Sequence, residues 1–552
     1  MIGSFKELDR KRRSRGFEPP KALQHPVMQS LRIRMAGSIL SGMLLALAFP
    51  GFGKSTLVYA ALVPLLFAVQ SVSVKRAAGL GLLSGFVFFI ISLSWLHNLT
   101  AMVEGAGLRL SALLGYAVLA LYCALYFIPF SMVAAVGARR WVGNDLLKNV
   151  RFMMVLTAVW VGSEYLRSFL LTGFPWNPLG VSQYANTSLI QVAQWGGVYL
   201  VSATIVWMNA ALFITFRQYT HGIRLSKYRP HFELMIGVLP IALSIMHGMN
   251  VLFSKAAPRS GVNVALIQPN IPQSVKWDEA KDQEIRVRLE ELTEEVAHLR
   301  GLDLVIWPET AVPDFVRSSS ASYDMVGRLA AQGTPLLVGT MDFTVSDAGI
   351  TYYNSSILFD TNGNEIGKYD KQHLVPFGEY VPLPGLMRKF TPIEVDFGRG
   401  AGSTLLPING ESSFSVLICF EDTVAPLAVN AVRAGARWLV NQTNDAWFDP
   451  SAESEQHLAH AVFRCVENRV PMARSCNTGV TCFIDAYGTV KRSLAVRTPG
   501  FTASQIHPRA ADAEFTFYTR YGDLFARVCL LIGAAACYTL RTPRIPAAGK
   551  AS

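Results

Sequence analysis

Cys419, Lys371 and Glu309 are residues whose side chains could together perform nucleophilic catalysis. Cys419 follows the apolar run 416–418, which predicts a buried strand that ends in a polar loop. A thiol attacks as a thiolate, and its ordinary pKa of about 8.5 leaves only a small fraction ionised at neutral pH. Glu309 is therefore a candidate base for the thiol proton. Lys371 is a candidate cation that stabilises both this carboxylate and an oxyanion.

Further polar groups lie near these three residues in the sequence. Glu379 follows Lys371 by eight residues, and Glu421 follows the cysteine by two; both are candidates to position Lys371 or a leaving group. The backbone amide of Phe420 is a candidate second oxyanion donor. His373 offers an alternative Cys-His pair, which we favour less because its neighbours form a lysine-centred arrangement. Each residue alone also has an ordinary structural interpretation, so the prediction depends on their combination.

Short apolar strands alternate with helices in the part of the chain that carries these residues. A charged helix is expected over 279–299, and Asn362-Gly363 predicts a hairpin turn. The predicted strands are 262–267, 303–307, 336–339, 355–359, 414–418 and 438–440. This alternation indicates an α/β layered domain with site residues in the loops at the strand ends.

Long apolar segments dominate the rest of the 552 residues. A bilayer core of about 30 Å requires about 20 helical residues, so these segments predict a multi-pass α-helical membrane domain with about eight spans. The predicted spans are 35–50, 55–73, 78–97, 109–136, 152–171, 195–216, 233–253 and 523–540. The predicted division is a basic cytoplasmic tail (1–34), a membrane domain of about seven helices (35–254), a catalytic domain (255–519), and a final span with its tail (520–552).

The formal net charge of +11 follows largely from Lys and Arg beside the apolar segments. Basic residues cluster in the loops after the second, fourth and sixth segments, whereas 172–194 has no charged residue. The positive-inside rule then places 255–519 outside the cytoplasm. The soluble part has no patch of interleaved basic and aromatic residues, which argues against a nucleic-acid partner.

The seven cysteines show no metal-binding spacing, and no metal is predicted. A disulfide among Cys465, Cys476 and Cys482 stays open. Glu164 and Arg167 lie three residues apart in the fifth span. They either serve a function at membrane depth or form a local pair near the interface.

The order and context of Glu309, Lys371 and Cys419 resemble the Glu-Lys-Cys triad of the nitrilase, or carbon-nitrogen hydrolase, superfamily. That resemblance implies a four-layer αββα sandwich. Four further motifs resemble the apolipoprotein N-acyltransferase family. They are Gly173-Phe174-Pro175-Trp176, 268–273 with Lys276-Trp277, 371–380, and 444–448.

The resemblance implies an N-acyltransferase in the inner membrane of a Gram-negative bacterium, with its catalytic domain in the periplasm. Such an enzyme moves an acyl chain from a phospholipid, usually phosphatidylethanolamine, through a cysteine thioester. The acceptor is the α-amino group of the N-terminal diacylglyceryl-cysteine of an apolipoprotein, and no cofactor is implied. The alternatives are a membrane-tethered amidase, in which water resolves the thioester, and a transporter with an external ligand-binding domain.

The resemblance makes Glu309 the base, Lys371 the oxyanion stabiliser and Cys419 the nucleophile. Trp277, Glu379 and Glu421 match positions that the family uses around its site.

Phe420 departs from the tyrosine that often follows the nucleophile, and Asp449 departs from an expected glycine. Trp447 and Phe448 are expected either to form a lid that dips into lipid or to pack as ordinary aromatic residues.

Overall fold

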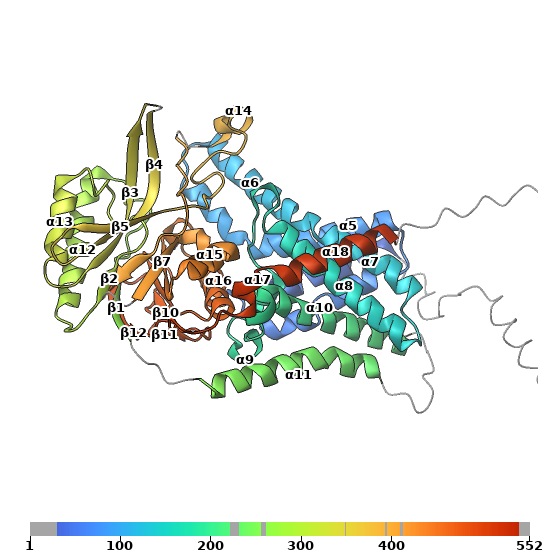
Figure 1. The fold of residues 1–552 in the computed structure, drawn as a ribbon. Helices are drawn as coiled ribbons and strands as arrows, with labels where there is room; N and C mark the ends of the chain where they lie inside the picture. Colours follow the sequence, from blue (N-terminus) through green and yellow to red (C-terminus); the bar gives the residue numbers. More distant parts are fainter. Residues whose placement is uncertain are drawn as a thin grey trace, which may run out of the picture.

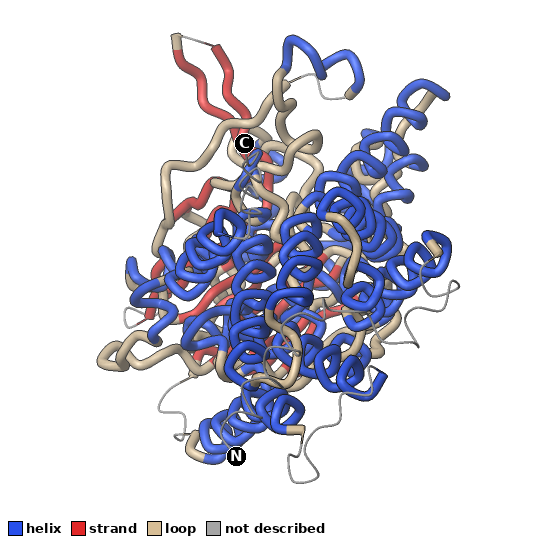
Figure 2. The backbone as a smooth tube through the Cα atoms, turned by 90° about the vertical axis from the view of Figure 1, so that its right-hand side faces the viewer, coloured by secondary structure: helices blue, strands red, loops and turns tan. Residues whose placement is uncertain are grey.

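The computed structural model describes residues 30–220, 231–255, 261–347, 349–391, 395–408 and 412–539. A helical half and a layered α/β half lie side by side (Figure 1). Figure 2 views the molecule from the end of the helical half. Most of the predicted basic tail (1–34) and the chain after 539 lie outside the described residues. So do Arg224, Lys227 and Arg229 of the predicted basic loop.

The helical half contains every apolar segment that the sequence predicts. Its main helices are α3 (Leu31–Leu47), α4 (Val63–Val69), α5 (Val74–Ser92), α6 (Ala106–Leu125), α7 (Phe127–Arg140), α8 (Leu146–Arg167), α10 (Ala193–Thr220), α11 (Phe232–Phe253) and the C-terminal α18 (Leu524–Thr539). Helix α18 returns from the α/β half and packs on α8. A Cβ at Gly162 of α8 would lie 2.7 Å from the Leu530 Cα, so glycine permits this close approach.

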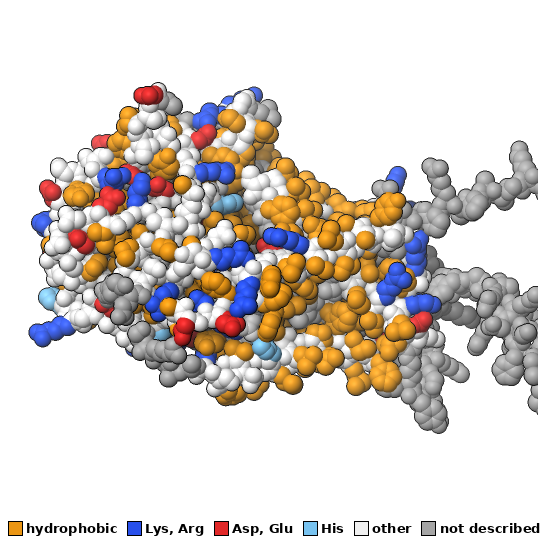
Figure 3. All heavy atoms as spheres, viewed as in Figure 1, with side chains coloured by type: hydrophobic (Ala, Val, Ile, Leu, Met, Phe, Trp, Pro, Cys, Tyr) orange, Lys and Arg blue, Asp and Glu red, His pale blue; other side chains and the backbone are white. Residues whose placement is uncertain are grey.

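Five helical stretches among the described residues are long and apolar enough to cross a membrane: Val74–Ser92, Ala106–Arg140, Leu146–Arg167, Ala193–Thr220 and Phe232–Phe253. Ser55–Val69 and Leu524–Thr539 are shorter apolar helices. The predicted count of about eight spans is therefore not confirmed, although the membrane domain is. Apolar side chains cover much of the visible surface of this half (Figure 3).

The predicted segment 109–136 consists of two helices rather than one. Helix α6 ends at Leu125 and α7 begins at Phe127. Pro129 is the third residue of α7, where its missing amide proton is tolerated because the first turn has no intrahelical acceptors for it.

The α/β half is a sandwich of two six-stranded sheets, with strand orders β12-β1-β2-β3-β4-β5 and β11-β10-β9-β8-β7-β6. The first contains β1 (Val262–Gln268), β2 (Leu304–Ile306), β3 (Leu336–Ser346), β4 (Gly349–Phe359), β5 (Glu365–Asp370) and β12 (Gly500–Ile506). The second contains β6 (Leu406–Ile408), β7 (Ser412–Ile418), β8 (Trp438–Thr443), β9 (Met472–Cys476), β10 (Cys482–Ile484) and β11 (Val490–Lys491).

Parallel strands form the centre of each sheet: β1, β2 and β3 in the first, and β7, β8 and β9 in the second. Helices α12 (Asp282–Ala297) and α13 (Ser320–Ala330) cover the outer face of the first sheet, and α15 (Ala425–Ala434) and α16 (Glu453–Asn468) cover that of the second (Figure 1). This arrangement confirms the αββα sandwich. The carboxyl ends of β2 and β7 deliver Glu309 and Cys419 to one edge.

Three groups of buried apolar residues form the core. One fills the space between the sheets, and a second lies between the first sheet and α12 and α13. The third joins the membrane helices to α15, α16 and the second sheet, and it includes Leu417 next to the candidate nucleophile turn. The second sheet therefore shares a continuous core with the membrane half.

Candidate active site

Cys419 occupies a tight turn directly after β7. Its φ of 52° lies in the left-handed region, which is unfavourable for a residue with a Cβ. The carbonyl oxygen of Cys419 accepts a hydrogen bond of 3.2 Å from Nδ2 of Asn441 on β8. The turn is thus held by a neighbouring strand, and the thiol stands at the edge of the sheet.

Lys371 is placed between two carboxylates at the end of β5. Its Nζ lies 2.8 Å from Oε1 of Glu379 and 3.6 Å from Oε1 of Glu309, and the side chain is 1% exposed. Asn354 of β4 donates to the same two carboxylates, at 2.7 Å to Glu309 and 3.1 Å to Glu379. The structure therefore brings the predicted base, the predicted cation and Glu379 into one hydrogen-bonded group.

The electrostatics of this group define its resting protonation. Burial raises the pKa of Cys419 well above its usual value, the charge of Glu309 raises it further, and Lys371 opposes both effects. Burial alone would lower the pKa of Lys371, but Glu379 and Glu309 outweigh it, and the net shift is upward. The resting site therefore holds a protonated thiol and a charged lysine. Attack by sulfur requires a base. Glu309 is the carboxylate whose charge has the largest effect on the pKa of Cys419.

Glu421 links the loop that follows Lys371 to the nucleophile turn. Its carboxylate accepts from the backbone amides of Gln372 (2.7 Å), His373 (2.9 Å) and Ile418 (2.7 Å), and from the Tyr369 hydroxyl (2.8 Å). These four donors occupy both oxygens of the fully buried carboxylate. Glu421 therefore holds the two loops of the site together.

Phe420 connects the site to the membrane half. Its ring stacks on Trp176 at 6.0 Å between centroids with an interplanar angle of 6°, and on Phe174 at 6.1 Å. His373 stacks on Phe420 from the α/β half at 5.9 Å. Burial, followed by the charge of Lys371, lowers the pKa of His373 to about 4. His373 is thus a neutral ring packed beside Phe420.

The other predicted aromatic residues lie nearer the surface. Trp277 is 52% exposed and Trp447 is 41% exposed. Phe448 packs edge-on against Trp95 of the membrane half at 4.7 Å, and its carbonyl accepts from Asn98. These contacts place Phe448 between the two halves, and the lid interpretation stays a prediction for Trp447 and Phe448.

Lys276 is a site residue that the sequence interpretation passed over in favour of its neighbour Trp277. It is 2% exposed, and its Nζ donates to the backbone carbonyl of Glu309 at 3.2 Å. Burial lowers the pKa of Lys276 to about 8, and the charges of Glu309, Cys476 and Cys419 oppose that shift. From the sequence alone, a lysine in a polar stretch is expected to be solvated. Its place in the motif 268–277 was the only available signal.

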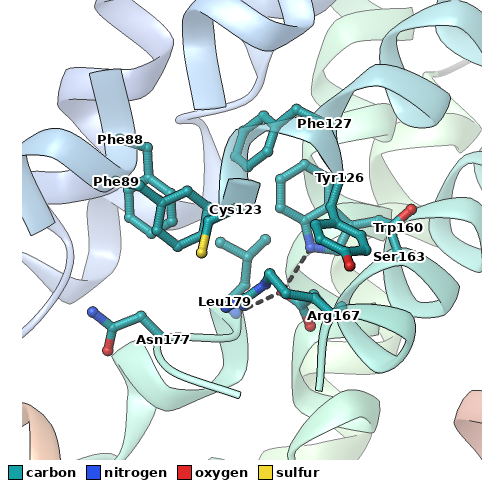
Figure 4. A pocket seen from close by; sticks show the side chains of 11 residues that line it. Phe88, Phe89, Cys123, Tyr126, Phe127, Trp160, Ser163, Arg167, Asn177 and Leu179 are labelled. Carbon is teal, nitrogen blue, oxygen red and sulfur yellow. Dashed lines mark hydrogen bonds between the residues drawn. The ribbon is translucent and has the colours of Figure 1, made fainter. Parts of the chain in front are cut away.

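Glu164 and Arg167 do not pair with each other among the described residues. Oε1 of Glu164 accepts from the Trp160 indole (2.7 Å) and the Leu179 amide (2.8 Å). Arg167 donates to the carbonyls of Phe174 and Trp176, each at 2.7 Å. Both side chains line a cavity of about 20 Å³ whose other walls include Asn177 and Leu179 (Figure 4). The two charges thus anchor the loop whose aromatic rings stack on Phe420.

All seven cysteines are free, including Cys465, Cys476 and Cys482. Glu309, Lys371 and Glu379 form one group, and Glu421 links the loop after Lys371 to the turn of Cys419 and Phe420, whose ring stacks on the membrane half. A multi-pass helical domain fused to an αββα sandwich with a Cys-Lys-Glu cluster defines a membrane-embedded protein of the carbon-nitrogen hydrolase class.

Comparison with known proteins identifies the family. The family model described as the apolipoprotein N-acyltransferase N-terminal domain matches residues 41–211, and that of the carbon-nitrogen hydrolases matches residues 263–504. A protein named apolipoprotein N-acyltransferase from Geobacter metallireducens is 36% identical, over 90% of this chain and 93% of the relative. Those from Brucella melitensis (32%; 78% and 80%) and Pseudomonas syringae (31%; 90% and 94%) also match. The chain belongs to the apolipoprotein N-acyltransferase family.

Among solved structures, Saccharomyces cerevisiae Nit3, a member of branch 10 of the nitrilase superfamily, is 18% identical. The alignment covers 49% of this chain and 97% of Nit3, with a TM-score of 0.35. A score this low carries no weight for the family assignment.

Proposed function

We propose that this protein transfers a fatty acyl chain from a membrane phospholipid, through a thioester at Cys419, to the α-amino group of a diacylated apolipoprotein. Family membership supports the overall reaction. The observation that carries the mechanism is the juxtaposition of a partly buried thiol with a buried carboxylate and a buried lysine, next to the residue that stacks on the membrane half.

In the first half-reaction, Sγ of Cys419 attacks the ester carbonyl carbon of the donor while Glu309 accepts the thiol proton. The oxyanion develops against Lys371, whose positive charge is maintained by Glu379 and Glu309. When the tetrahedral intermediate collapses, the carbon–oxygen bond to the glycerol backbone breaks. Glu309 returns its proton to the departing alkoxide, and a lysophospholipid leaves.

In the second half-reaction, the neutral α-amino group of the acceptor attacks the thioester carbonyl. Glu309 accepts a proton from the attacking nitrogen, the carbon–sulfur bond breaks, and the thiolate regains a proton from Glu309. The amide product leaves with the acyl chain. Each half-reaction thus returns the base and the nucleophile to their starting states.

A membrane location explains why this site differs from that of a soluble hydrolase. Both substrates are lipid-anchored, so holding the thiol beside the bilayer raises the frequency of productive encounters. Phe420 stacks on Trp176, which places the nucleophile turn directly against the membrane half. We further propose phosphatidylethanolamine as the donor.

The proposed topology places the α/β half in the periplasm of an inner-membrane protein. Lys and Arg gather at the end of the helical half that lies far from the sandwich (Figure 3). This end contains the start of α5, the end of α7 and the start of α8, near Arg76, Arg140 and Lys148. A cytoplasmic location for that end agrees with the positive-inside rule.

The test is intact mass of the purified protein after incubation with phosphatidylethanolamine, before and after neutral hydroxylamine, with Cys419→Ala alongside. We expect a fatty-acyl increment that hydroxylamine removes and the variant lacks. A diacylated lipopeptide should then discharge the increment and become triacylated. Discharge by water at the same rate, with no triacylated product, would establish the amidase-type alternative. Triacylated product made equally well by the variant would reject Cys419 as nucleophile.

A further inference from the structure

His457 lies at the start of α16 and is buried among groups that accept hydrogen bonds. Its Nε2 is 3.2 Å from the carbonyl oxygen of Cys419 and 2.9 Å from Oδ1 of Asp422. Its Nδ1 is 3.1 Å from Oδ1 of Asp445 and 3.5 Å from Oε1 of Glu453. A neutral imidazole has a single N–H, whereas acceptors here face both nitrogens. The geometry therefore favours the imidazolium form.

The surrounding charges agree with this protonation state. Burial lowers the pKa of His457, but Asp422 on the nucleophile turn and Asp445 after β8 raise it more strongly, to about 10. Arg474 of β9 is the cation that opposes them, and Glu453 lies on the same helix. The charge on His457 is therefore expected to persist across the physiological pH range.

Three of these side chains, Asp445, Glu453 and His457, also have the spacing of a metal site, with ligand atoms within 4.8 Å of one another. A cation of the protein already pairs with Asp445, however. Arg474 lies 3.3 Å from Oδ2 of Asp445 and 2.8 Å from Oδ2 of Asp422, and the Thr443 hydroxyl donates to Oδ1 of Asp445. His457, Arg474 and Asp445 thus form an ion-pair network within the protein.

The network contacts the backbone of Cys419, the proposed nucleophile. The left-handed backbone of Cys419 is unfavourable and persists only if its surroundings hold it. Two side chains reach its carbonyl oxygen: Asn441 from β8 and His457 from α16. A hydrogen bond from a charged donor is about twice as strong as one from a neutral donor, so His457 provides the stronger restraint.

Helix α16 is itself fixed to the membrane half at the preceding residue. Oε1 of Gln456 accepts from the indoles of Trp95 (3.2 Å) and Trp176 (2.8 Å), and from Nδ2 of Asn177 (3.0 Å). Its Nε2 donates to the carbonyls of Pro50 and Ser92. Residues 456 and 457 thus connect the membrane half to the backbone of the nucleophile.

We propose that His457 is a positioning residue for the acyl-transfer reaction: as an imidazolium held by Asp422 and Asp445, it fixes the Cys419 carbonyl and with it the direction of the thiol. This inference rests on the proposed function of Cys419. The hydrogen bond links a buried charged network to the reacting atom through one backbone group, so its loss should affect the chemical steps rather than substrate binding.

The test compares His457→Ala and His457→Gln with Val462→Ala in the purified full-length protein. Val462 is a fully buried apolar residue one turn further along α16, and its truncation destabilises the same helix without removing a polar contact of the site. Acyl transfer from phosphatidylethanolamine to a diacylated lipopeptide gives kcat and KM. Melting temperature reports stability, and alkylation of Cys419 by iodoacetamide reports thiol presentation without using the donor.

We expect His457→Ala to lower kcat by about 100-fold and to change KM for the lipopeptide by less than about 3-fold. Alkylation of Cys419 should slow as well. His457→Gln should recover about 10-fold in kcat, because its amide can donate to the same carbonyl. Val462→Ala should keep kcat near that of the wild-type protein even when its melting temperature falls as far as that of His457→Ala.

The proposal is overturned if His457→Ala keeps kcat within about 3-fold of wild type, or if Val462→Ala loses as much kcat at equal stability. It is also overturned if His457→Gln is no better than His457→Ala. Wild-type protein without any acyl transfer would instead reject the proposed function. In that case slower alkylation of His457→Ala would still support the positioning role, and unchanged alkylation would reject it.

Discussion

The two sheets of the sandwich hold the two sides of the site in different ways. The sheet that delivers Cys419 is covered by α15 and α16 and shares one apolar core with the membrane helices. The sheet that delivers Glu309 and Lys371 is covered by α12 and α13, whose core is separate. The nucleophile is therefore positioned relative to the bilayer, whereas the base and the lysine are positioned relative to the nucleophile through the core between the sheets.

A shared device appears on both sides. Each reacting residue has its backbone carbonyl bound by a buried basic side chain from elsewhere: Lys276 reaches Glu309, and His457 reaches Cys419. The charge balance nevertheless differs. Lys371 is a cation between two carboxylates, whereas His457 and Arg474 are cations among Asp422, Asp445 and Glu453. In the proposed mechanism, the first group tunes the reacting atoms and the second fixes their geometry.

The largest expected effect is the loss of the nucleophile itself. Cys419→Ala should lower acyl transfer by about four orders of magnitude or more, because it removes the sulfur at which we propose that the thioester forms. Membrane insertion and melting temperature should change little, because the substitution removes one sulfur atom and leaves no buried charge without a partner. The check is transfer of labelled acyl chain to lipopeptide, with size-exclusion behaviour as the control for folding. Retained transfer would remove the basis for assigning different roles to the two sheets.

Lys371→Met should produce the next largest effect. It leaves Glu309 and Glu379 without their shared cation in a buried site, so we expect a kcat lower by about 10²–10³-fold and a stability loss of about 3 kcal/mol. Kinetics and thermal unfolding measure the two effects. Glu379→Gln is the matched control because Lys371 then keeps Glu309 as a partner. If Glu379→Gln were the more damaging change, the lysine would not be the centre of this group.

Glu309→Gln should slow acyl transfer but speed the alkylation of Cys419. Acyl transfer should fall by about 10²-fold because the base is lost. The pKa of the Cys419 thiol should also fall, because the nearby carboxylate charge is one of the causes that raise it. More thiolate is then present at any pH below that pKa, so iodoacetamide should alkylate Cys419 faster between about pH 7 and 8.

Peptide-resolved mass spectrometry separates Cys419, which is partly exposed, from Cys537, which is exposed. Alkylation that slows in Glu309→Gln would contradict the assignment of a charged carboxylate beside the thiol.

The candidate site residues could be proposed from the sequence because their chemistry is unusual for their sequence context. A thiol at the end of an apolar strand, with Glu309 after another strand, limits the possible arrangements. Lys276 and His457 were not predictable in the same way. A lone lysine or histidine in a polar stretch is normally solvated, and only the tertiary fold shows that each is buried against a backbone carbonyl.

The fold was predictable to a similar degree. Long apolar segments and the strands β1, β2, β3, β4, β7 and β8 have clear patterns, and the structure contains them; the central strand β9 was missed. The edge strand β11 and its neighbour β10 have only two and three residues, too few for any periodicity to be visible. The break between α6 and α7 was missed because a proline in a first helical turn does not interrupt an apolar pattern.

The smallest expected effect concerns Glu164, for which the sequence left a functional and a local structural role open. Oε1 accepts both of its hydrogen bonds, and Oε2 has no hydrogen-bond partner among the described residues. A glutamine can keep the Oε1 contacts, so Glu164→Gln should retain kcat within about 3-fold. Glu164→Ala leaves the Trp160 indole and the Leu179 amide unsatisfied, which should lower stability by about 2 kcal/mol.

That loss should loosen the loop that stacks Trp176 on Phe420 and reduce kcat by about 10-fold. Kinetics and thermal unfolding of the two variants measure this contrast. If Glu164→Gln lost as much activity as Glu164→Ala, the charge itself would matter. The membrane half would then take part in the chemistry, in addition to positioning the nucleophile sheet.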